Sequence, residues 1–297
     1  MSNKPRKMTL EKKHNLTGWA FLAPATFLIA VFSFWPMIKA LVLSFQTGKG
    51  RNMQMAGFTN YIRMFQDDVF IQSIKNTFFY FILQVPIMLV VALVLACILN
   101  KKDLRFKGFF RTMIFLPCTT SLVAYSIIFR SLFANDGLVN YVLVNLGILD
   151  KPYNFLTQPF AAKVVIILGL LWRWTGYNMV FFLSGLQNIE YSVYEAAKID
   201  GASAIQTFFK ITVPLLKPTI LLTAIMSTNG TLQLFDESIN LTDGGPANAS
   251  ISMSHYIYNL CFKYVPNFGY AAAMSFFILL LVAVLAFIQM RVGDKRD

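Results

Sequence analysis

The chain has 297 residues, of which 56% are hydrophobic and only 13% are charged. An average soluble domain has roughly 25% charged residues, so this composition excludes an ordinary water-soluble protein and indicates a membrane protein. Basic residues outnumber acidic ones by 26 to 14, but they gather in short connections between apolar runs. That distribution is typical of membrane topology, and we expect no nucleic-acid partner.

Few side chains are available for metal binding or catalysis. Cys97, Cys118 and Cys261 show no CxxC spacing, and the two histidines of the sequence, His14 and His255, are far apart. We therefore expect no disulfide framework, no metal site and no catalytic residues.

Six stretches are long and apolar enough to cross a hydrocarbon core of roughly 30 Å. The first follows a basic tail, but its apolar run from Trp19 to Ile38 is too long for a signal peptide. The sequence predicts an all-α polytopic membrane protein with a tail at 1–17, one six-span domain at 18–292 and a short tail at 293–297. The predicted spans are 18–40, 76–99, 109–130, 161–187, 218–236 and 268–290.

Basic residues predict the orientation, because Lys and Arg are retained on the cytoplasmic side. Five precede the first span, and five more lie at 101–111, between the second and third spans. Both termini and the connection at 190–217 are therefore expected in the cytoplasm. The connections at 46–75, 131–160 and 237–267 are expected outside.

The connection between the fourth and fifth spans contains a polar, alanine-rich stretch, EAAKIDGASAIQTFFKITVPLLKP, from Glu195 to Pro218. Ser192 with Glu195 fits an S-x-x-E capping box, and Ser203 with Gln206 fits its S-x-x-Q form. Two short helices are therefore predicted, each beginning at one of these serines.

Glycine and proline predict the path between these helices and into the next span. Gly201 is expected to form a corner, because glycine accepts backbone angles that other residues resist. Val213 precedes Pro214 and is expected to be extended. Pro218 suits the first turn of the fifth span.

Two interpretations of this element are open. It could be an amphipathic connector that lies on the membrane, with Glu195 acting only as a cap. A membrane-lying helix favours a polar face rich in Lys and Arg, whereas the first helix has only Lys198. Its alanines, beside an acid and the aromatic Tyr191 and Tyr194, favour docking into a groove of another protein.

Polar side chains in the fourth and fifth spans are candidates for a substrate path, since intramembrane polar groups tend to face a wet cavity. In the fourth span the candidates and Phe181 share one helical face. In the fifth, Asp236 or Glu237 continues the spacing, and Gly230 is expected to break the helix. Aromatic rings and amides suit a sugar; the alternative is packing between helices. The candidates are Arg173, Trp174, Tyr177, Asn178, Asn229, Gln233 and Asp236.

The stretch EAAKIDGASAIQTFFKITVP resembles the EAA loop of ATP-binding-cassette importer permeases. That loop reads EAA, three residues, Gly, nine residues, Ile, one residue, Leu and Pro. The segments FLSGLQNI, ending at Ile189, and LFDESINLTDGGP, at 234–246, resemble the maltose-type carbohydrate-uptake branch, and the likeness covers about residues 15–292. Valine replaces the leucine at Val213, and the matching positions are Glu195, Ala196, Ala197, Gly201, Ile211 and Pro214.

The resemblance implies a type I importer permease fold in the bacterial cytoplasmic membrane, and import of a sugar or oligosaccharide. Its partners would be a second, homologous permease, two ATPase subunits that bind ATP and Mg, and an extracytoplasmic solute-binding protein near the outer turn at 243–246. This chain has no GxxxxGK[ST] loop and would bind no cofactor. Glu195 would pair with a cation of the ATPase. The coupling residues would be Glu195, Ala196, Ala197, Asp200, Gly201, Ala202, Ile211 and Pro214.

The alternative function is a secondary carrier or channel for a small polar solute. Such a protein would be expected to have acid or histidine relays within its spans, or inverted repeats with broken helices in both halves. The sequence shows one candidate break and no obvious repeat.

Overall fold

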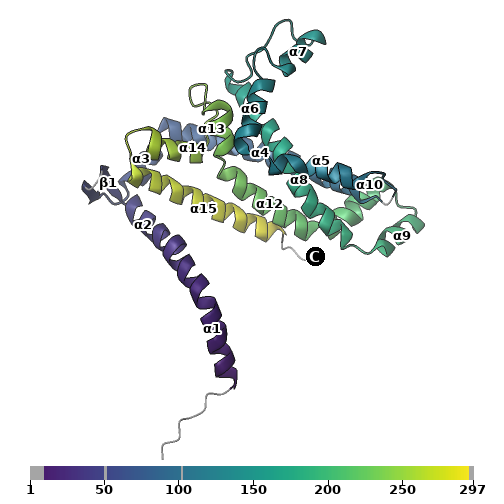
Figure 1. Cartoon of the computed structure of the whole chain (residues 1–297), viewed down its shortest axis with the longest axis horizontal. Helices are drawn as coiled ribbons and strands as arrows, with labels where there is room; N and C mark the ends of the chain where they lie inside the picture. The colour runs from purple at the N-terminus through teal and green to yellow at the C-terminus, as the bar shows by residue number, and fades with distance from the viewer. Residues whose placement is uncertain (1–9, 50–51, 102, 294–297) are drawn as a thin grey trace, which may run out of the picture.

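A computed structural model describes residues 10–49, 52–101 and 103–293. The tail residues 1–9 and 294–297, and Lys102 of the basic connection, lie outside the described residues. The described chain is helical apart from one hairpin, and Figure 1 shows its elements. They are α1 Leu10–Ile29, η1 Ala30–Phe34, α2 Trp35–Ser44, β1 Gln46–Lys49, β2 Asn52–Met55, α3 Thr59–Met64, α4 Asp68–Asn100, α5 Lys107–Thr119, α6 Leu122–Leu132, α7 Leu138–Asn145, α8 Pro159–Gln187, α9 Tyr191–Ile199, α10 Ala204–Thr207, η2 Phe208–Thr212, α11 Val213–Leu215, α12 Lys217–Leu232, α13 Asp236–Thr242, α14 Met253–Tyr258, η3 Asn259–Lys263 and α15 Phe268–Gly293.

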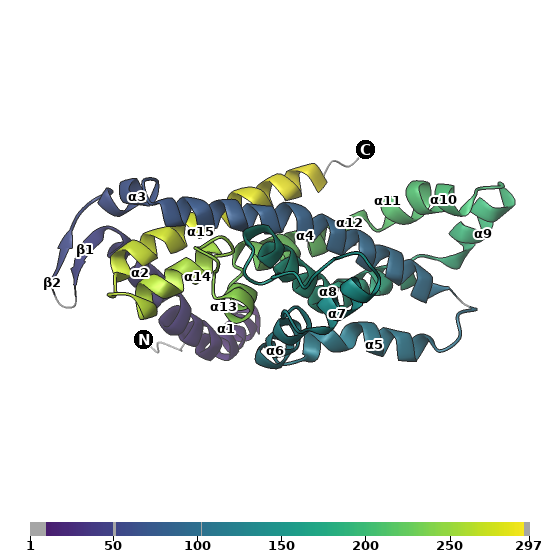
Figure 2. The same cartoon turned by 90° about the horizontal axis from the view of Figure 1, so that it is seen from above.

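The all-α prediction is confirmed, and one short hairpin is the addition to it among the described residues. Strands β1 and β2 pair antiparallel, with Gln46 opposite Met55. The Asn60 side-chain amide donates to the carbonyls of Ser44 and Gln46, at 2.9 and 2.8 Å, which ties the hairpin to α3. The hairpin and the α9–α10 region lie at opposite ends of the molecule (Figure 2).

Four helical segments of the described chain are each long and apolar enough to cross a membrane: the continuous α1–η1–α2 segment, α4, α8 and α15. Two helix pairs pass the same test together but are bent, by 98° between α5 and α6 and by 70° between α11 and α12. The count reaches the predicted six if each bent pair is one span. Helix α1 already begins at Leu10, within the predicted tail.

The predicted span 109–130 is therefore not one straight helix. Pro117 supplies no N–H to the helical ladder, and α5 ends two residues later, at Thr119. Thr120 then takes an extended backbone, with ψ of 148°, while its hydroxyl donates to the Pro117 carbonyl at 2.7 Å. The bend thus satisfies one of the carbonyls that it frees.

The predicted span 218–236 is also too long, and its break is displaced. Gly230 lies within α12, which continues to Leu232, so the prediction of a break at Gly230 is wrong. The chain leaves the helix at Gln233–Phe235 and re-enters one at Asp236. The Ser252 hydroxyl accounts for this position, since it donates to the Leu234 carbonyl at 2.5 Å.

Helices α4 and α8 form the centre of the structure. Ala92 and Ala96 of α4 pack with Met179 and Phe182 of α8 in one apolar cluster. Helix α5 approaches α8 so closely that a Cβ at Gly176 would overlap the Ile114 carbonyl. Small residues at such contacts let membrane helices gain van der Waals packing.

The segment α1–η1–α2 leaves this body as an arm (Figure 1). Described side chains from Leu10 to Lys39 are exposed, including Trp19 at 69% and Phe21 at 82%. No Lys, Arg, Asp or Glu occurs between His14 and Ile38. This apolar surface has no cover within the described chain, so lipid or another protein must supply it.

Candidate functional site

A cavity of about 620 Å³ lies between α4, α8, α12 and the turn from α12 to α13. Arg173 and Gln84, near the midpoints of α8 and α4, both reach it. Six of the seven predicted substrate-path residues line it: Arg173, Trp174, Tyr177, Asn178, Gln233 and Asp236. Asn229 does not line it and is instead exposed, where its side-chain oxygen accepts a hydrogen bond from the Gln233 amide.

A chain of polar contacts joins the three helices around the cavity. The Thr231 hydroxyl of α12 donates to the Gln84 amide oxygen of α4 at 2.9 Å, and the Gln84 amide contacts the Met88 sulfur at 3.0 Å. The Asn178 amide of α8 reaches the same sulfur at 3.5 Å and accepts from the Ser227 hydroxyl at 3.3 Å. Asn178 therefore makes the interhelical contacts of the packing alternative while it lines the cavity.

Aromatic side chains form one side of the cavity, as the helical spacing predicted. The rings of Trp174 and Tyr177 meet edge to face at 5.8 Å and 87°, and those of Tyr177 and Phe181 at 5.1 Å and 65°. Edge-to-face packing restrains each ring and leaves its other surfaces available for contacts. Such rings can stack against the CH-rich face of a sugar.

Charged side chains complete the lining. Arg173 is buried, with its guanidinium 5.5 and 5.4 Å from the ring centres of Tyr125 and Trp174. Its Nε and Nη1 atoms are buried and have no hydrogen-bond partner among the described residues. Glu237 is also buried, and it lines the cavity together with Trp174. Asp236 is only half-buried.

Several lining residues were missed by the sequence reasoning. Helical spacing did not separate Asp236 from Glu237, whereas the structure brings both to the cavity and buries Glu237 more deeply. Gln84 interrupts the apolar run YFILQVPIML, and an isolated amide inside a predicted span was the available signal. Thr231 carried no comparable signal, because a threonine hydroxyl can bond to its own helix.

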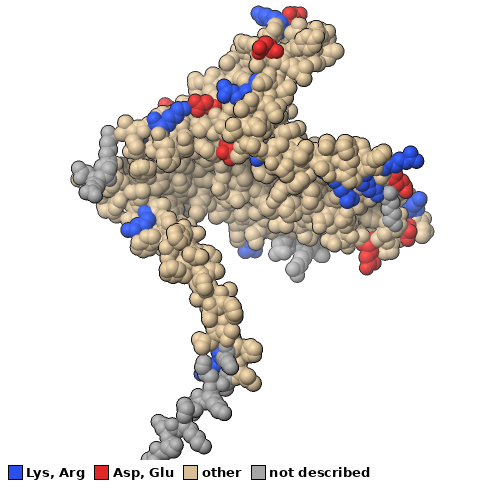
Figure 3. Space-filling model, in the orientation of Figure 1, with Lys and Arg blue, Asp and Glu red and all other residues tan. Residues whose placement is uncertain are grey.

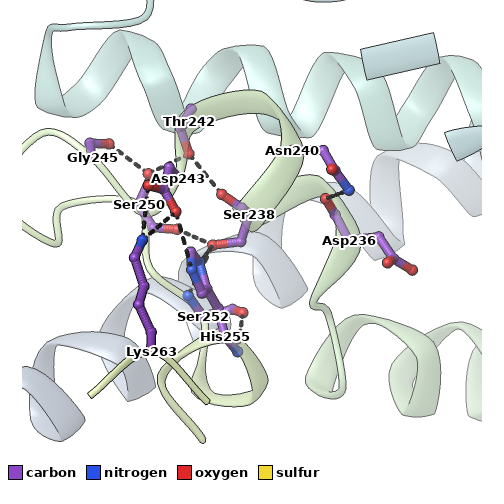
Figure 4. A network of polar contacts seen from close by, with 10 residues as sticks. All are labelled: Asp236, Ser238, Asn240, Thr242, Asp243, Gly245, Ser250, Ser252, His255 and Lys263. Atoms are coloured by element: carbon purple, nitrogen blue, oxygen red, sulfur yellow. Dashed lines mark hydrogen bonds and ion pairs between the residues drawn. The ribbon is translucent and has the colours of Figure 1, made fainter. Parts of the chain in front are cut away.

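A polar network holds α13 in place (Figure 4). The Ser238 hydroxyl lies 3.0 Å from Nδ1 of His255 and donates to the Ser250 carbonyl at 3.1 Å. Asp243 forms an ion pair with Lys263 at 2.9 Å and lies 3.6 Å from Nε2 of His255. The network fixes the segment that brings Asp236 and Glu237 to the cavity.

The predicted turn at 243–246 is part of this network. Asp243 and Gly244 both have positive φ, at 48° and 74°, and the Ser250 hydroxyl donates to the Gly245 carbonyl at 2.6 Å.

Burial lowers the pKa of His255 below its usual range; Asp243 opposes this shift and Lys263 reinforces it.

The second candidate site is the predicted coupling element, a helix, corner and helix at one end of the molecule (Figure 1). Gly201 has φ of +76°. Its N–H donates to the Lys198 carbonyl at 3.2 Å, and the Ala202 N–H donates to the Ala197 carbonyl at 2.9 Å, which is a Schellman motif. The predicted corner and the capping box of Ser203 with Gln206 are confirmed.

Two local predictions here are wrong. Helix α9 begins at Tyr191 after an extended Glu190, and the Ser192 hydroxyl bonds to the Glu190 carboxylate at 3.3 Å, so Ser192 is not its cap. Val213 is helical, with φ of −62° and ψ of −46°. The wider π-helical turn η2 just before it accounts for this, because it changes the carbonyl spacing that makes proline clash in a regular helix.

Exposure divides the predicted coupling residues. Glu195, Ala196, Asp200, Gly201 and Pro214 are exposed, Ala202 and Ile211 are half-buried, and Ala197 is buried within the chain.

Large apolar side chains accompany the exposed coupling residues: Ile199 is 85% exposed, Ile205 71% and Phe209 65%. Both acidic and basic side chains gather at this end (Figure 3). A hollow of about 920 Å³ separates the element from the end of α4, and Tyr194 lines it. The element thus exposes apolar and charged side chains together.

Comparisons with known proteins show the family and the fold of the chain. Residues 68–296 match the family model described as "Binding-protein-dependent transport system inner membrane component". The lactose transport system permease protein LacF of Rhizobium radiobacter is 52% identical over 292 residues, covering 98% of each chain. The arabinooligosaccharides transport system permease protein AraP of Bacillus subtilis is 31% identical over 280 residues, 93% of this chain and 88% of that one.

The fold also has a solved relative. A crystal structure of a bacterial ABC transporter involved in the import of the acidic polysaccharide alginate contains a chain that matches with a TM-score of 0.84. The identity is 24%, and the match covers 95% of this chain and 96% of the other.

Proposed function

The chain belongs to the family of binding-protein-dependent transport system inner membrane components, and from this premise we propose that it is one of two permease subunits of an ATP-driven importer for a sugar or oligosaccharide. A member of this family is a multi-pass inner-membrane permease, a transport subunit rather than an ATPase. The proposal concerns its substrate, its coupling to ATP hydrolysis and its partner permease.

The cavity at the middle of α4 and α8 supports the sugar assignment, and it is the observation on which that assignment rests. It combines the Trp174 and Tyr177 rings with the amides of Gln84 and Asn178. Rings stack on the apolar face of a sugar, while amides and hydroxyls match its directional hydroxyl groups. The relatives named for lactose and arabinooligosaccharides support the same class of substrate.

The α9–α10 element is proposed to couple this cavity to a partner ATPase, which binds ATP and Mg²⁺. Glu195 is exposed on α9, and the highly exposed Ile199 and Ile205 flank the Gly201 corner. Apolar side chains next to a charge form the kind of small surface that concentrates binding energy in a groove. Ala197, being buried, serves the packing of the element itself.

The exposed arm of α1, η1 and α2 supports a second permease as partner. Its side chains are uncharged and mostly apolar from Asn15 to Ile38, and the large apolar ones are exposed in the described chain. We propose that part of this surface packs on a homologous permease, with two ATPase subunits and an extracytoplasmic binding protein completing the assembly.

The test is to tag this chain in its host, purify it in mild detergent, identify the associated subunits and reconstitute the complex in vesicles. Uptake of labelled lactose that needs both ATP and the binding protein is the expected result. Lactose is the first sugar to try because of the 52% identical relative. Uptake by this chain alone, in vesicles without ATP, would support the secondary carrier instead.

A further inference from the structure

Arg173 is a buried cation in a transport cavity, an arrangement that by itself suggests an anionic substrate. The lining has opposing charges, however. Among the described residues that line the cavity, Arg173, Asp236 and Glu237 are the charged ones. Two carboxylates and one guanidinium give this lining no excess of positive charge.

Glu237 of α13 and Arg173 of α8 line the same cavity, and both are buried. Opposite charges in one cavity offset each other even without direct contact. Trp174 and Tyr177 of α8 line the same cavity, so Glu237 shares it with the aromatic stripe of that helix. An anionic sugar entering here would meet Glu237 and Asp236 at short range, and like charges brought together in a poorly hydrated site repel strongly.

A neutral sugar meets no such repulsion. The Arg173 guanidinium, which lines the cavity, can donate hydrogen bonds to sugar oxygens, and the Glu237 carboxylate can accept them from hydroxyl groups. The fold does not decide the charge of the substrate, because a chain of the same fold serves the import of an acidic polysaccharide. Any charge preference of this subunit must therefore lie in its lining side chains.

We propose that Glu237 is a specificity-determining residue, which offsets the charge of Arg173 so that the cavity accepts uncharged sugars and rejects acidic ones. This inference rests on the proposed function, since it assumes that the cavity holds the transported sugar. Glu237→Gln removes the charge and keeps the size of the side chain and one acceptor oxygen.

The test is direct binding to the purified transporter complex, without the binding protein, because that protein would otherwise select the sugar first. Labelled lactose and labelled digalacturonate, a dianionic disaccharide, are compared on wild type and on Glu237→Gln. We expect the ratio of digalacturonate to lactose affinity to rise about ten-fold or more in the variant. Asp150→Asn, at an exposed carboxylate in an outer connection, is the matched control and should leave the ratio unchanged.

Arg173→Gln and the double variant provide a second readout. Loss of Arg173 alone leaves the Glu237 charge uncompensated, so lactose binding should fall further than in the double variant, where both charges are absent. If the wild-type system takes up lactose but Glu237→Gln has the same ratio of digalacturonate to lactose affinity as the wild type, this inference is wrong and the proposed function stands. Absence of sugar uptake by the complete wild-type system contradicts the proposed function and the inference with it.

Discussion

The Tyr270 hydroxyl donates a hydrogen bond of 2.7 Å to the carboxylate of Asp67, which joins the beginning of α4 to the beginning of α15 across 203 residues. The Tyr256 hydroxyl donates to the same oxygen at 2.7 Å, while the other oxygen of Asp67 accepts from the Val69 and Phe70 N–H groups. One carboxylate thus caps α4 and binds two tyrosines.

Asp67→Asn should destabilise the protein by about 1–3 kcal/mol, because an asparagine has one acceptor oxygen for contacts that use two. Thermal unfolding of the purified complex in detergent measures this. Asp68→Asn is the matched control, since Asp68 is an exposed neighbour in the first turn of α4. Equal shifts in the two variants would contradict the assigned role of Asp67.

The same carboxylate predicts acid sensitivity. Burial raises the pKa of Asp67, but the hydrogen bonds from Tyr256, Tyr270 and two backbone N–H groups outweigh it, so the pKa lies below its usual 3.8. A lowered pKa means that the unfolded state binds protons more readily, so this stabilisation is complete above the unfolded pKa and lost as pH falls through the folded one. Asp67→Asn should reduce the stability difference between neutral and strongly acidic buffer.

His255 predicts a separate response at milder pH. Its pKa is lowered mainly by burial, so the stability contributed by the neutral ring is present above the unfolded pKa, about 6.5, and declines as pH falls through the folded value. Amide hydrogens of α13 should exchange faster at about pH 5 than at about pH 7.5, after correction for intrinsic rates. In His255→Asn, the α13 exchange rates at these two pH values should differ less than in the wild type.

Gly201 predicts an uncoupled variant. Alanine at its φ of +76° costs about 1–2 kcal/mol of local strain, and valine more. We expect sugar transported per ATP hydrolysed to fall several-fold in Gly201→Val. Gly147→Val is a close control, because Gly147 has φ of +68° and, like Gly201, open space around its Cβ position, but lies in the connection between α7 and α8. If the two variants transport the same amount of sugar per ATP hydrolysed, Gly201 has no special role in coupling.

Gln233 and Asn178 should separate binding from packing. Gln233 is exposed at the cavity, so Gln233→Ala should raise KM for uptake and leave Tm unchanged. Asn178→Ala also removes the contacts with Met88 and Ser227, so both transport and Tm should fall. Gln54→Ala, on the exposed hairpin, serves as control. Unchanged kinetics at both cavity positions would contradict the substrate-path assignment.

The long helices α4, α8 and α15 were predictable because an unbroken apolar run in a membrane protein has few alternatives to a helix. The corner at Gly201 and the Ser203 cap were predictable because they follow from local chemistry. The end of α12 was not, since it depends on the Ser252 hydroxyl, 18 residues beyond the Leu234 carbonyl that it binds. The helical Val213 was missed for a similar reason, because a π-helical turn overrides the usual preference before proline.

Within the cavity, the helical face of Trp174, Tyr177 and Asn178 could be read from their spacing. Gln84 and Glu237 line the cavity because of the way α4 and α13 pack against α8. That packing could not be derived from a single sequence.

Helix α12 begins at the 70° bend after α11 and ends in the cavity, where Thr231 bonds to Gln84. Its 16 residues make a rigid rod about 24 Å long at 1.5 Å per residue. If this 24 Å rod tilts by about 5° about its end at the bend, its far end moves by about 2 Å. That displacement exceeds the tolerance of a 2.9 Å hydrogen bond, so a small movement of the α9–α10 element is geometrically sufficient to detach α12 from α4.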